Sequence, residues 1–181
     1  MKKLVMTVAV LACAAVVASA QTVTSANMVG YAKVTAVKGQ LSLVSLNFEP
    51  SSSLVADLIG DQLPVNSKLH IWDKSTGGYN TVVNGTRGGW GSTATVELGD
   101  AFWIELPATA PLVTNEVILS GEVLLAETNS TSIGGPIDAT GFFYPVDILW
   151  GDTDLAAQLP INAKLHVWNG GGYDTFVNGT R

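Results

Sequence analysis

The chain has 181 residues, with 9 basic and 15 acidic side chains and a formal net charge of −6. Hydrophobic residues make up 47% of it and charged residues only 13%, which is the composition of an ordered protein and not of a disordered one. The acidic balance argues against nucleic acid and anionic membrane surfaces as partners, because both require a basic face on the protein.

Residues 1–20 have the pattern of a secretory signal peptide. Lys2 and Lys3 form a short positive start, residues 4–17 are uncharged and apolar, and Ala18-Ser19-Ala20 is typical of a cleavage site. The apolar run is shorter than the roughly 20 residues that a membrane-spanning helix needs. We therefore predict a protein that is secreted, placed on the cell surface or released into the periplasm, with no membrane span after the signal is removed.

Removal of the signal would change both charge and thiol chemistry. It would leave 161 residues with seven basic and fifteen acidic side chains, a net charge of −8. The single cysteine, Cys13, would leave with the signal, and the exported chain could then form neither a disulfide nor a thiolate metal site. Residues 10–13 also loosely resemble a bacterial lipobox, in which Cys13 would carry the lipid, but the apolar run continues through residues 14–17, where a lipoprotein turns polar.

An internal repeat organises the rest of the sequence. QLPVNSKLHIW at 62–72 returns as QLPINAKLHVW at 158–168, and GGYNTVVNGTR at 77–87 returns as GGYDTFVNGTR at 171–181. Seventeen of the 24 residues in the second copy are identical to their counterparts. Self-similarity at this level predicts two equivalent structural units.

The repeat extends upstream but stops short downstream. A weaker match joins residues 39–48 to 141–150, whereas the stretch that follows Arg87 in the first copy, up to residue 107, has no counterpart after Arg181. We therefore expect a fragment or a natural truncation, with a second module that lacks roughly 20 residues. The missing strands would leave an unpaired strand edge, which soluble proteins normally avoid.

Short runs rich in β-branched and aromatic residues, bounded by Gly, Pro or Asn, predict strands. They lie at residues 41–48, 68–73, 79–83, 93–98 and 101–106. Residues 74–78 and Gly99-Asp100 predict the hairpin turns between them.

The other predicted elements are a helix in each module and a strand pair between the modules. A short helix is expected at residues 53–59, capped by serine and stopped by Gly60, and Asp152 would cap its counterpart. Residues 113–127 predict a strand pair with a bend at Ser120-Gly121. Residues 129–136 predict a flexible stretch near the module boundary.

These elements predict an all-β protein of two tandem sandwich-like or barrel-like modules, each with one short helix. The first module would span residues 22–127, and the second, incomplete one residues 128–181.

The aromatic side chains are the main candidates for a binding site. Planar rings on a β face can stack on sugars, but Trp and Tyr also fill small cores. The residues Tyr79, Trp90, Trp103 and Tyr173 are the candidate ligand contacts. Trp90, in a glycine-rich loop, is the best candidate for exposure, whereas Trp72 and Trp168 are expected in the core.

His70 and His166 occupy equivalent positions, two residues before a Trp on a predicted strand, and therefore share a face with it. Each could be a ligand or a proton-transfer group. A packed or surface histidine is the favoured interpretation, because each module offers a single His, with no second His or Cys for zinc and no nucleophile nearby.

Two groups of carboxylates are candidates for a catalytic or a metal-binding site. Asp100 and Glu105 could form a glycosidase pair, but their odd spacing on one strand predicts opposite faces. Asp152 and Asp154, with Asp138 and Asp147 nearby, could hold calcium, but helix capping is the better account of the pair. We therefore predict no enzyme activity, no metal and no cofactor.

Three tripeptides, at Asn84, Asn129 and Asn178, match the N-glycosylation acceptor pattern. Asn-Gly is also the strongest signal for a type I′ hairpin turn. Beside a bacterial-type signal peptide, the turn interpretation is favoured for the two Asn-Gly pairs, at Asn84 and Asn178.

The strings KLHIW at 68–72, GYNT at 78–81 and LGDAFW at 98–103 resemble tandem β modules of secreted proteins from environmental bacteria. The resemblance implies export and repetition and assigns no activity or site residue. The sequence as a whole predicts a secreted, non-enzymatic repeat protein of structural, surface or adhesion type, with other envelope or matrix proteins or glycans as partners. The alternative is a carbohydrate-binding module associated with polysaccharide use.

Overall fold

The computed structural model describes residues 28–87, 89–91, 93–126 and 128–179. The predicted signal peptide and Cys13 lie outside the described residues, so export and lipidation stay predictions. Within the described ranges no helix has the length and apolar character that crossing a membrane requires.

The described chain consists mainly of strands with a few single-turn helical segments, which confirms the all-β prediction at that level. The strands are β1 (Val29–Val37), β2 (Leu41–Ser45), β3 (Lys68–Asp73), β4 (Gly78–Val83), β5 (Ala101–Glu105), β6 (Thr114–Glu122), β7 (Lys164–Trp168) and β8 (Tyr173–Val177). The helical segments are α2 (Val55–Leu58), η1 (Gly60–Gln62), η2 (Trp150–Asp152) and α3 (Asp154–Gln158). None of the sheets formed by these strands closes on itself.

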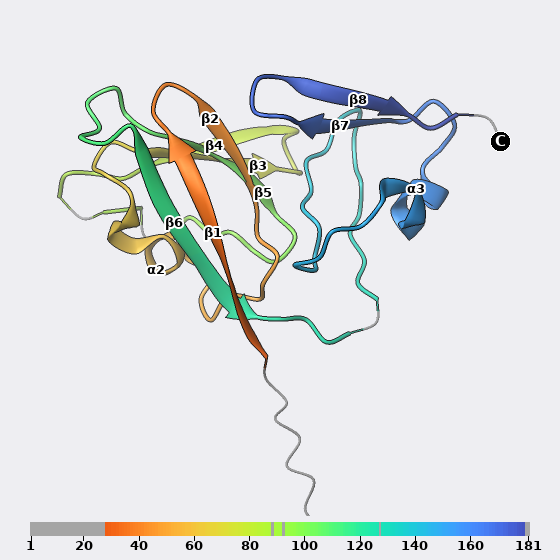
Figure 1. Ribbon diagram of the computed structural model, residues 1–181, viewed down its shortest axis with the longest axis horizontal. Helices are drawn as coiled ribbons and strands as arrows, with labels where there is room; N and C mark the ends of the chain where they lie inside the picture. The colour runs from red at the N-terminus through yellow and green to blue at the C-terminus, as the bar shows by residue number, and fades with distance from the viewer. Residues whose placement is uncertain (1–27, 88, 92, 127, 180–181) are drawn as a thin grey trace, which may run out of the picture.

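The first half of the chain folds as two packed sheets. Strands β2, β5, β3 and β4 form one antiparallel sheet in that spatial order, and β1 pairs with β6 in a second sheet (Figure 1). One hydrophobic cluster contains side chains of both sheets, among them Ala36 of β1, Val117 of β6 and Phe102 of β5. The two sheets therefore enclose a common core.

Alternation along β3 gives the four-stranded sheet two unlike faces. Leu69 and Ile71 are buried in the core, and Lys68, His70 and Trp72 stand on the opposite face because successive side chains of a strand point to opposite sides. The chemically interesting side chains of this sheet are therefore on its outer face.

Four of the five predicted strands form, as β2 to β5, with small shifts at their ends. The fifth, at residues 93–98, was wrong. The Val55 N–H donates to the Ala94 carbonyl at 2.9 Å and the Val96 N–H to the Ser53 carbonyl at 2.8 Å. This segment is held by isolated bonds to the residues ahead of α2, and the predicted hairpin with β5 does not form. The hairpin predicted at residues 74–78 is confirmed between β3 and β4.

Both helix caps differ from the prediction. Helix α2 is shorter than predicted, its N-cap is Leu54 with no side-chain hydrogen bond, and Gly60 begins η1 instead of ending the helical segment. At α3 the cap is Thr153, whose Oγ1 accepts from the Ala156 N–H at 3.1 Å. The prediction for Asp152 was off by one residue, because the residue immediately before the first helical turn is the one whose side chain reaches the free N–H groups.

The predicted strand pair at 113–127 is instead the single continuous strand β6. Gly121, expected at a bend, pairs with Gly30 of β1. Strand β1 was not among the strands predicted from the sequence. A Cβ on Gly121 would collide with the Glu49 carbonyl oxygen. The glycine is therefore required for the close approach of a third segment, and no bend forms there.

The second copy of the repeat forms the hairpin β7–β8 in the register of β3–β4. Lys68 lies opposite Val83, and Lys164 lies opposite Val177 in the same way. Among the described residues this hairpin is a two-stranded sheet of its own (Figure 1).

Residues 141–150, which match 39–48 in sequence, form no strand. The Gly141 N–H donates to the Gly99 carbonyl at 2.7 Å, and the Asn47 amide donates to the Tyr144 carbonyl at 3.3 Å. The start of this segment is therefore attached to the first half and supplies no strand beside β7.

Candidate functional site

Three of the four predicted ligand contacts come together, where the outer face of the first sheet meets the second hairpin. Trp103 of β5 donates from Nε1 to the Tyr79 hydroxyl of β4 at 3.0 Å. Its ring centroid lies 4.9 Å from that of Trp168 and 6.4 Å from that of Tyr173, both in edge-to-face geometry. These four rings are called the aromatic joint below.

The aromatic joint is closed at its centre and open at its edges. Trp103 is 6% exposed although it lies on the outer face of its sheet, whereas Tyr79 and Tyr173 remain about half exposed. Partial burial, together with the nearby Tyr79, raises the pKa of the Tyr173 phenol. Trp103 is enclosed by ring–ring contacts, Trp168 is half-buried, and the two tyrosines present the most surface to solvent.

The expectation that Trp90 is exposed was wrong. Its ring is 4% exposed within the core of the first half, and its Nε1 donates to the Gly60 carbonyl at 2.9 Å. Neighbouring glycines leave the backbone free to direct a Trp side chain into the core or toward solvent. The glycine-rich composition of the loop therefore did not determine that Trp90 would be exposed.

The expectation that Trp72 and Trp168 lie in the core was also wrong. Both are half-buried on outer faces: Trp72 donates to the Asp138 carboxylate at 2.8 Å, and Trp168 belongs to the aromatic joint. The core face of the first hairpin is occupied instead by Leu69 and Ile71, the residues on either side of His70.

His70 lies in a polar cluster with Glu105, Lys68 and Thr81. Its Nε2 is 3.0 Å from Glu105 Oε2 and its Nδ1 is 2.9 Å from the Thr81 hydroxyl. Since a carboxylate only accepts, the contact assigns a proton to Nε2. Lys68 donates to the other carboxylate oxygen at 2.9 Å, and this bond, with a smaller contribution from His70, holds the pKa of Glu105 below its usual range.

The second hairpin repeats half of this cluster. His166 Nδ1 is 2.9 Å from the Thr175 hydroxyl, as in the first copy. Among the described residues no carboxylate stands where Glu105 stands in the first copy, so Lys164 and the Nε2 of His166 have no partner there.

The two Asn-Gly pairs do not form the predicted type I′ turns. Asn84 lacks the positive φ such a turn needs, and its buried amide donates to the carbonyls of Leu63 and Pro64 at 2.9 and 3.3 Å. Asn178 makes the equivalent bonds to Leu159 and Pro160 at 2.8 and 3.2 Å. Each Asn fastens the end of a hairpin to the loop that precedes it.

Both carboxylates of the candidate glycosidase pair have structural partners. Asp100 accepts from the Glu97 N–H at 2.9 Å in a turn, and Glu105 is bound to Lys68 and His70. Within the described ranges, no three His, Cys, Asp or Glu side chains gather as a metal-ligand set.

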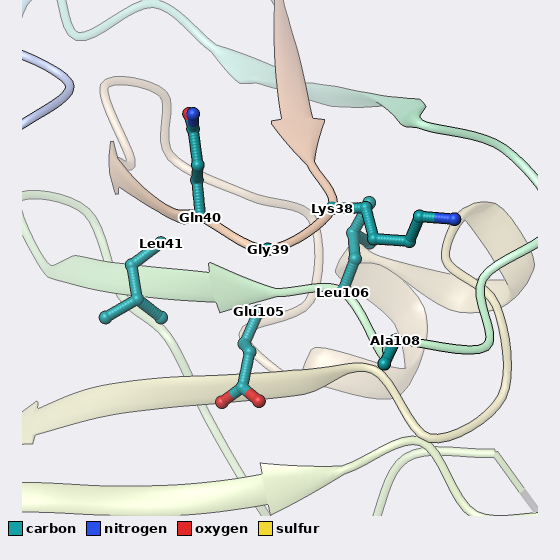
Figure 2. A pocket seen from close by; sticks show the side chains of 7 residues that line it. All are labelled: Lys38, Gly39, Gln40, Leu41, Glu105, Leu106 and Ala108. Carbon is teal, nitrogen blue, oxygen red and sulfur yellow. The ribbon is translucent and has the colours of Figure 1, made fainter.

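An open depression of about 600 Å³ lies beside Glu105 at the β1–β2 turn (Figure 2). Its lining residues are Lys38, Gly39, Gln40, Leu41, Glu105, Leu106 and Ala108. The Lys38 ammonium donates to the Ala110 carbonyl at 3.1 Å, and Glu105 is engaged with Lys68 and His70, so neither charge converges on the depression. None of the predicted ring contacts lines it.

Comparison of the chain with protein-family models, with curated proteins and with solved structures gave no match. The aromatic joint and the hairpin β7–β8 are therefore the features on which a functional conclusion rests.

Proposed function

We propose that this protein is a secreted, non-enzymatic component of structural, surface or adhesion type. Its two tandem β modules follow one plan, and the second module joins the molecule to other envelope or matrix proteins. The observation that carries the proposal is the contrast in burial between the two copies.

Several apolar side chains that are buried in the first half are exposed at the matching positions of the second. Val44 is 3% exposed and its counterpart Val146 is 63% exposed; Ile71 is 9% exposed and Val167 is 45% exposed. Single exposed apolar side chains are ordinary, but several at positions that match core positions are typical of a surface that further protein covers.

Export is supported by the charged start, apolar run and Ala-Ser-Ala of residues 1–20. An acidic, thiol-free mature chain would be compatible with an oxidising compartment. The non-enzymatic character is supported by the engagement of Glu105 and Asp100 in hydrogen bonds that stabilise the sheet and a turn.

Carbohydrate binding is the second candidate. The observation in its favour is that Tyr79 and Tyr173, which come from the two copies, are both half-exposed at the aromatic joint. Sugar stacking needs an open ring face, and these two rings are the most exposed of the joint.

Expression of the full chain in a bacterial host tests export directly. We expect the product outside the cytoplasm to begin at Gln21 on N-terminal sequencing. Antibodies against it should label intact cells of the producing bacterium without permeabilisation. Confinement of the product to the cytoplasm would overturn the proposal.

A glycan array with the exported product separates the two candidates. We expect no saturable binding. Saturable binding that is lost in both Tyr79→Ala and Tyr173→Ala, and retained in Tyr31→Ala on β1, would replace the structural proposal with the carbohydrate-binding one.

A further inference from the structure

Strand β1 lies beside β6 (Figure 1), and in the described chain no strand pairs with its other edge. The bonds just beyond the two ends of the ladder join Met28 to Val123 and Lys38 to Val113. Because hydrogen-bonded pairs alternate along an antiparallel ladder, the even-numbered residues of β1 bond to β6. The odd-numbered residues direct their backbone groups the other way, and among the described residues these groups have no hydrogen-bond partner at Val29, Tyr31, Lys33 and Thr35.

The opposite edge of the same sheet is closed at two points. Glu49 and Glu122 of β6 exchange two backbone bonds, at 2.9 and 2.8 Å. The Gln62 side-chain amide accepts from the Ile118 N–H at 2.6 Å and donates to the Ile118 carbonyl at 3.2 Å, as a neighbouring strand would. The β6 edge is therefore protected against pairing with another chain, whereas the β1 edge keeps its hydrogen-bonding groups available.

The side chains on the outer face of β1 combine exposed apolar surface with one charge. Val29 and Tyr31 are largely exposed. A lysine on an edge strand usually opposes pairing with another chain. Here the Lys33 ammonium is bound by Glu116 of β6 at 2.7 Å, which offsets its charge. Lys33 therefore restricts the register of an added strand and does not block the edge.

The free edge is complementary to itself in one register. The Val37 carbonyl already accepts from the Gln40 N–H, so the free edge ends at Thr35. Two antiparallel β1 strands use the whole edge when Val29 lies opposite Thr35 of the second copy. Tyr31 then lies opposite Lys33 in both halves, which places each ammonium against a phenol ring. A shift by two residues would instead place the two Lys33 ammonium groups opposite each other.

We propose that two copies of this chain associate through the free edges of β1, in the register that pairs Tyr31 of each copy with Lys33 of the other. The two β1–β6 sheets then form one continuous sheet with the strand order β6, β1, β1, β6. The same edge serves on both copies, so the association is isologous and closes as a dimer. The inference is independent of the proposed role of the second module.

Sedimentation velocity of the exported product over a dilution series tests the association. We expect the mass of two chains at high concentration and of one chain on dilution. Lys33→Pro removes an outward N–H near the centre of the new ladder and no bond to β6, so this variant should fold and stay a monomer. Lys33→Glu should weaken the dimer about tenfold, because two cation–π contacts are lost, and Lys33→Arg should retain it.

Disulfide trapping tests the register. Ala32 would lie opposite Ala32 of the second copy in a non-hydrogen-bonded pair, with Cα atoms about 4.5 Å apart, which is within the range of a disulfide. Ala32→Cys should therefore give a covalent dimer under mild oxidation. Val34→Cys, at a similarly half-buried position of the same face, lies opposite Gly30 and should not. The unmodified product, from which Cys13 would be removed with the predicted signal, is the control.

Three outcomes would overturn the inference. The first is a monomer at every concentration. The second is a dimer that Lys33→Pro leaves intact or that Ala32→Cys does not trap. The third is a monomer in which the Tyr31 and Lys33 amides exchange slowly with solvent deuterium, which would show that the edge is covered from within the chain. The glycan array and the labelling of intact cells report on the proposed function separately from these measurements.

Discussion

Trp103 and Trp168 meet edge to face, with ring centroids 4.9 Å apart and planes inclined at 89°. The first belongs to β5 and the second to β7, so this contact joins the two copies of the repeat. Tyr173, 5.3 Å from Trp168 and 6.4 Å from Trp103, completes a three-ring contact. The outer face of the four-stranded sheet and the hairpin β7–β8 are therefore held together by aromatic packing.

A double-mutant cycle of Trp103→Leu and Trp168→Leu should give a coupling free energy of about 0.5–1.5 kcal/mol, the range for aromatic pairs beyond simple burial. The measurement is urea unfolding of the four proteins, followed by tyrosine and tryptophan fluorescence. A matched cycle of Trp168→Leu with Trp72→Leu, whose ring contact is with Tyr79, should be additive. Additivity of the Trp103 and Trp168 changes would contradict the aromatic joint.

Asn84→Ala should destabilise the first half by about 1–3 kcal/mol, because the buried Leu63 carbonyl would lose its side-chain donor; the Pro64 carbonyl keeps its bond from the Ser67 N–H. Asn178→Ala removes the same bonds from a more exposed site, where water can replace the amide, and should cost less. Chemical denaturation of the two variants gives the comparison. Equal losses would indicate that the two sites are equally shielded from water.

Gly121→Ala should destabilise the β1–β6 sheet by about 1–3 kcal/mol, since the new Cβ would collide with the backbone oxygen of Glu49. Gly30→Ala meets the ring of Phe48 instead, and a side chain can shift more readily than backbone. Gly91→Ala, which has no neighbour within 4 Å, is the control. The order of unfolding temperatures should be Gly91→Ala, then Gly30→Ala, then Gly121→Ala as the lowest.

The Glu105 carboxyl should make stability depend on pH. The pKa of Glu105 in the folded protein is lowered, mainly by the hydrogen bond from Lys68. Its contribution to the free energy of unfolding is therefore present above the unfolded pKa of about 4.3 and is lost as the pH falls through the folded pKa. Glu105→Gln should therefore unfold at a lower temperature than the unmodified chain at pH 7, with a difference that shrinks toward pH 3. Because the pair is partly exposed, high salt should also reduce the difference.

The control for this pH dependence is Glu116→Gln, which removes a carboxylate from the exposed Lys33 pair on the other sheet. A difference between Glu105→Gln and the unmodified chain that stays constant from pH 7 to pH 3 would show that the carboxylate charge of Glu105 does not contribute.

Local patterns predicted the β3–β4 hairpin correctly. Alternation of Leu69 and Ile71 with polar neighbours, and a Gly-containing turn, fix β3 and β4 without reference to the rest of the molecule. Strand β1 was missed although it alternates, because few of its side chains are buried; Ala36 is its one residue in the core.

The candidate site depended on information that no local pattern contains. Glu105 meets His70 because β5 enters the sheet beside β3 in a particular register, and residues 35 positions apart give no signal of it. The burial of Trp90 and the outward position of Trp72 were likewise decided by which elements pack on each face. Periodicity showed that faces differ and could not show which face would be covered.

The ladder between β1 and β6 has a mechanical consequence. Val29, where β1 begins, lies opposite Glu122, where β6 ends, so the chain enters and leaves the first half at neighbouring points. Once the contact between Trp103 and Trp168 is lost, tension between the N-terminal segment and the second hairpin would fall on this end of the ladder. Its bonds would then break one after another instead of sharing the load. In an anchored protein, this sheet would open at low force and act as an extensible element ahead of the four-stranded sheet.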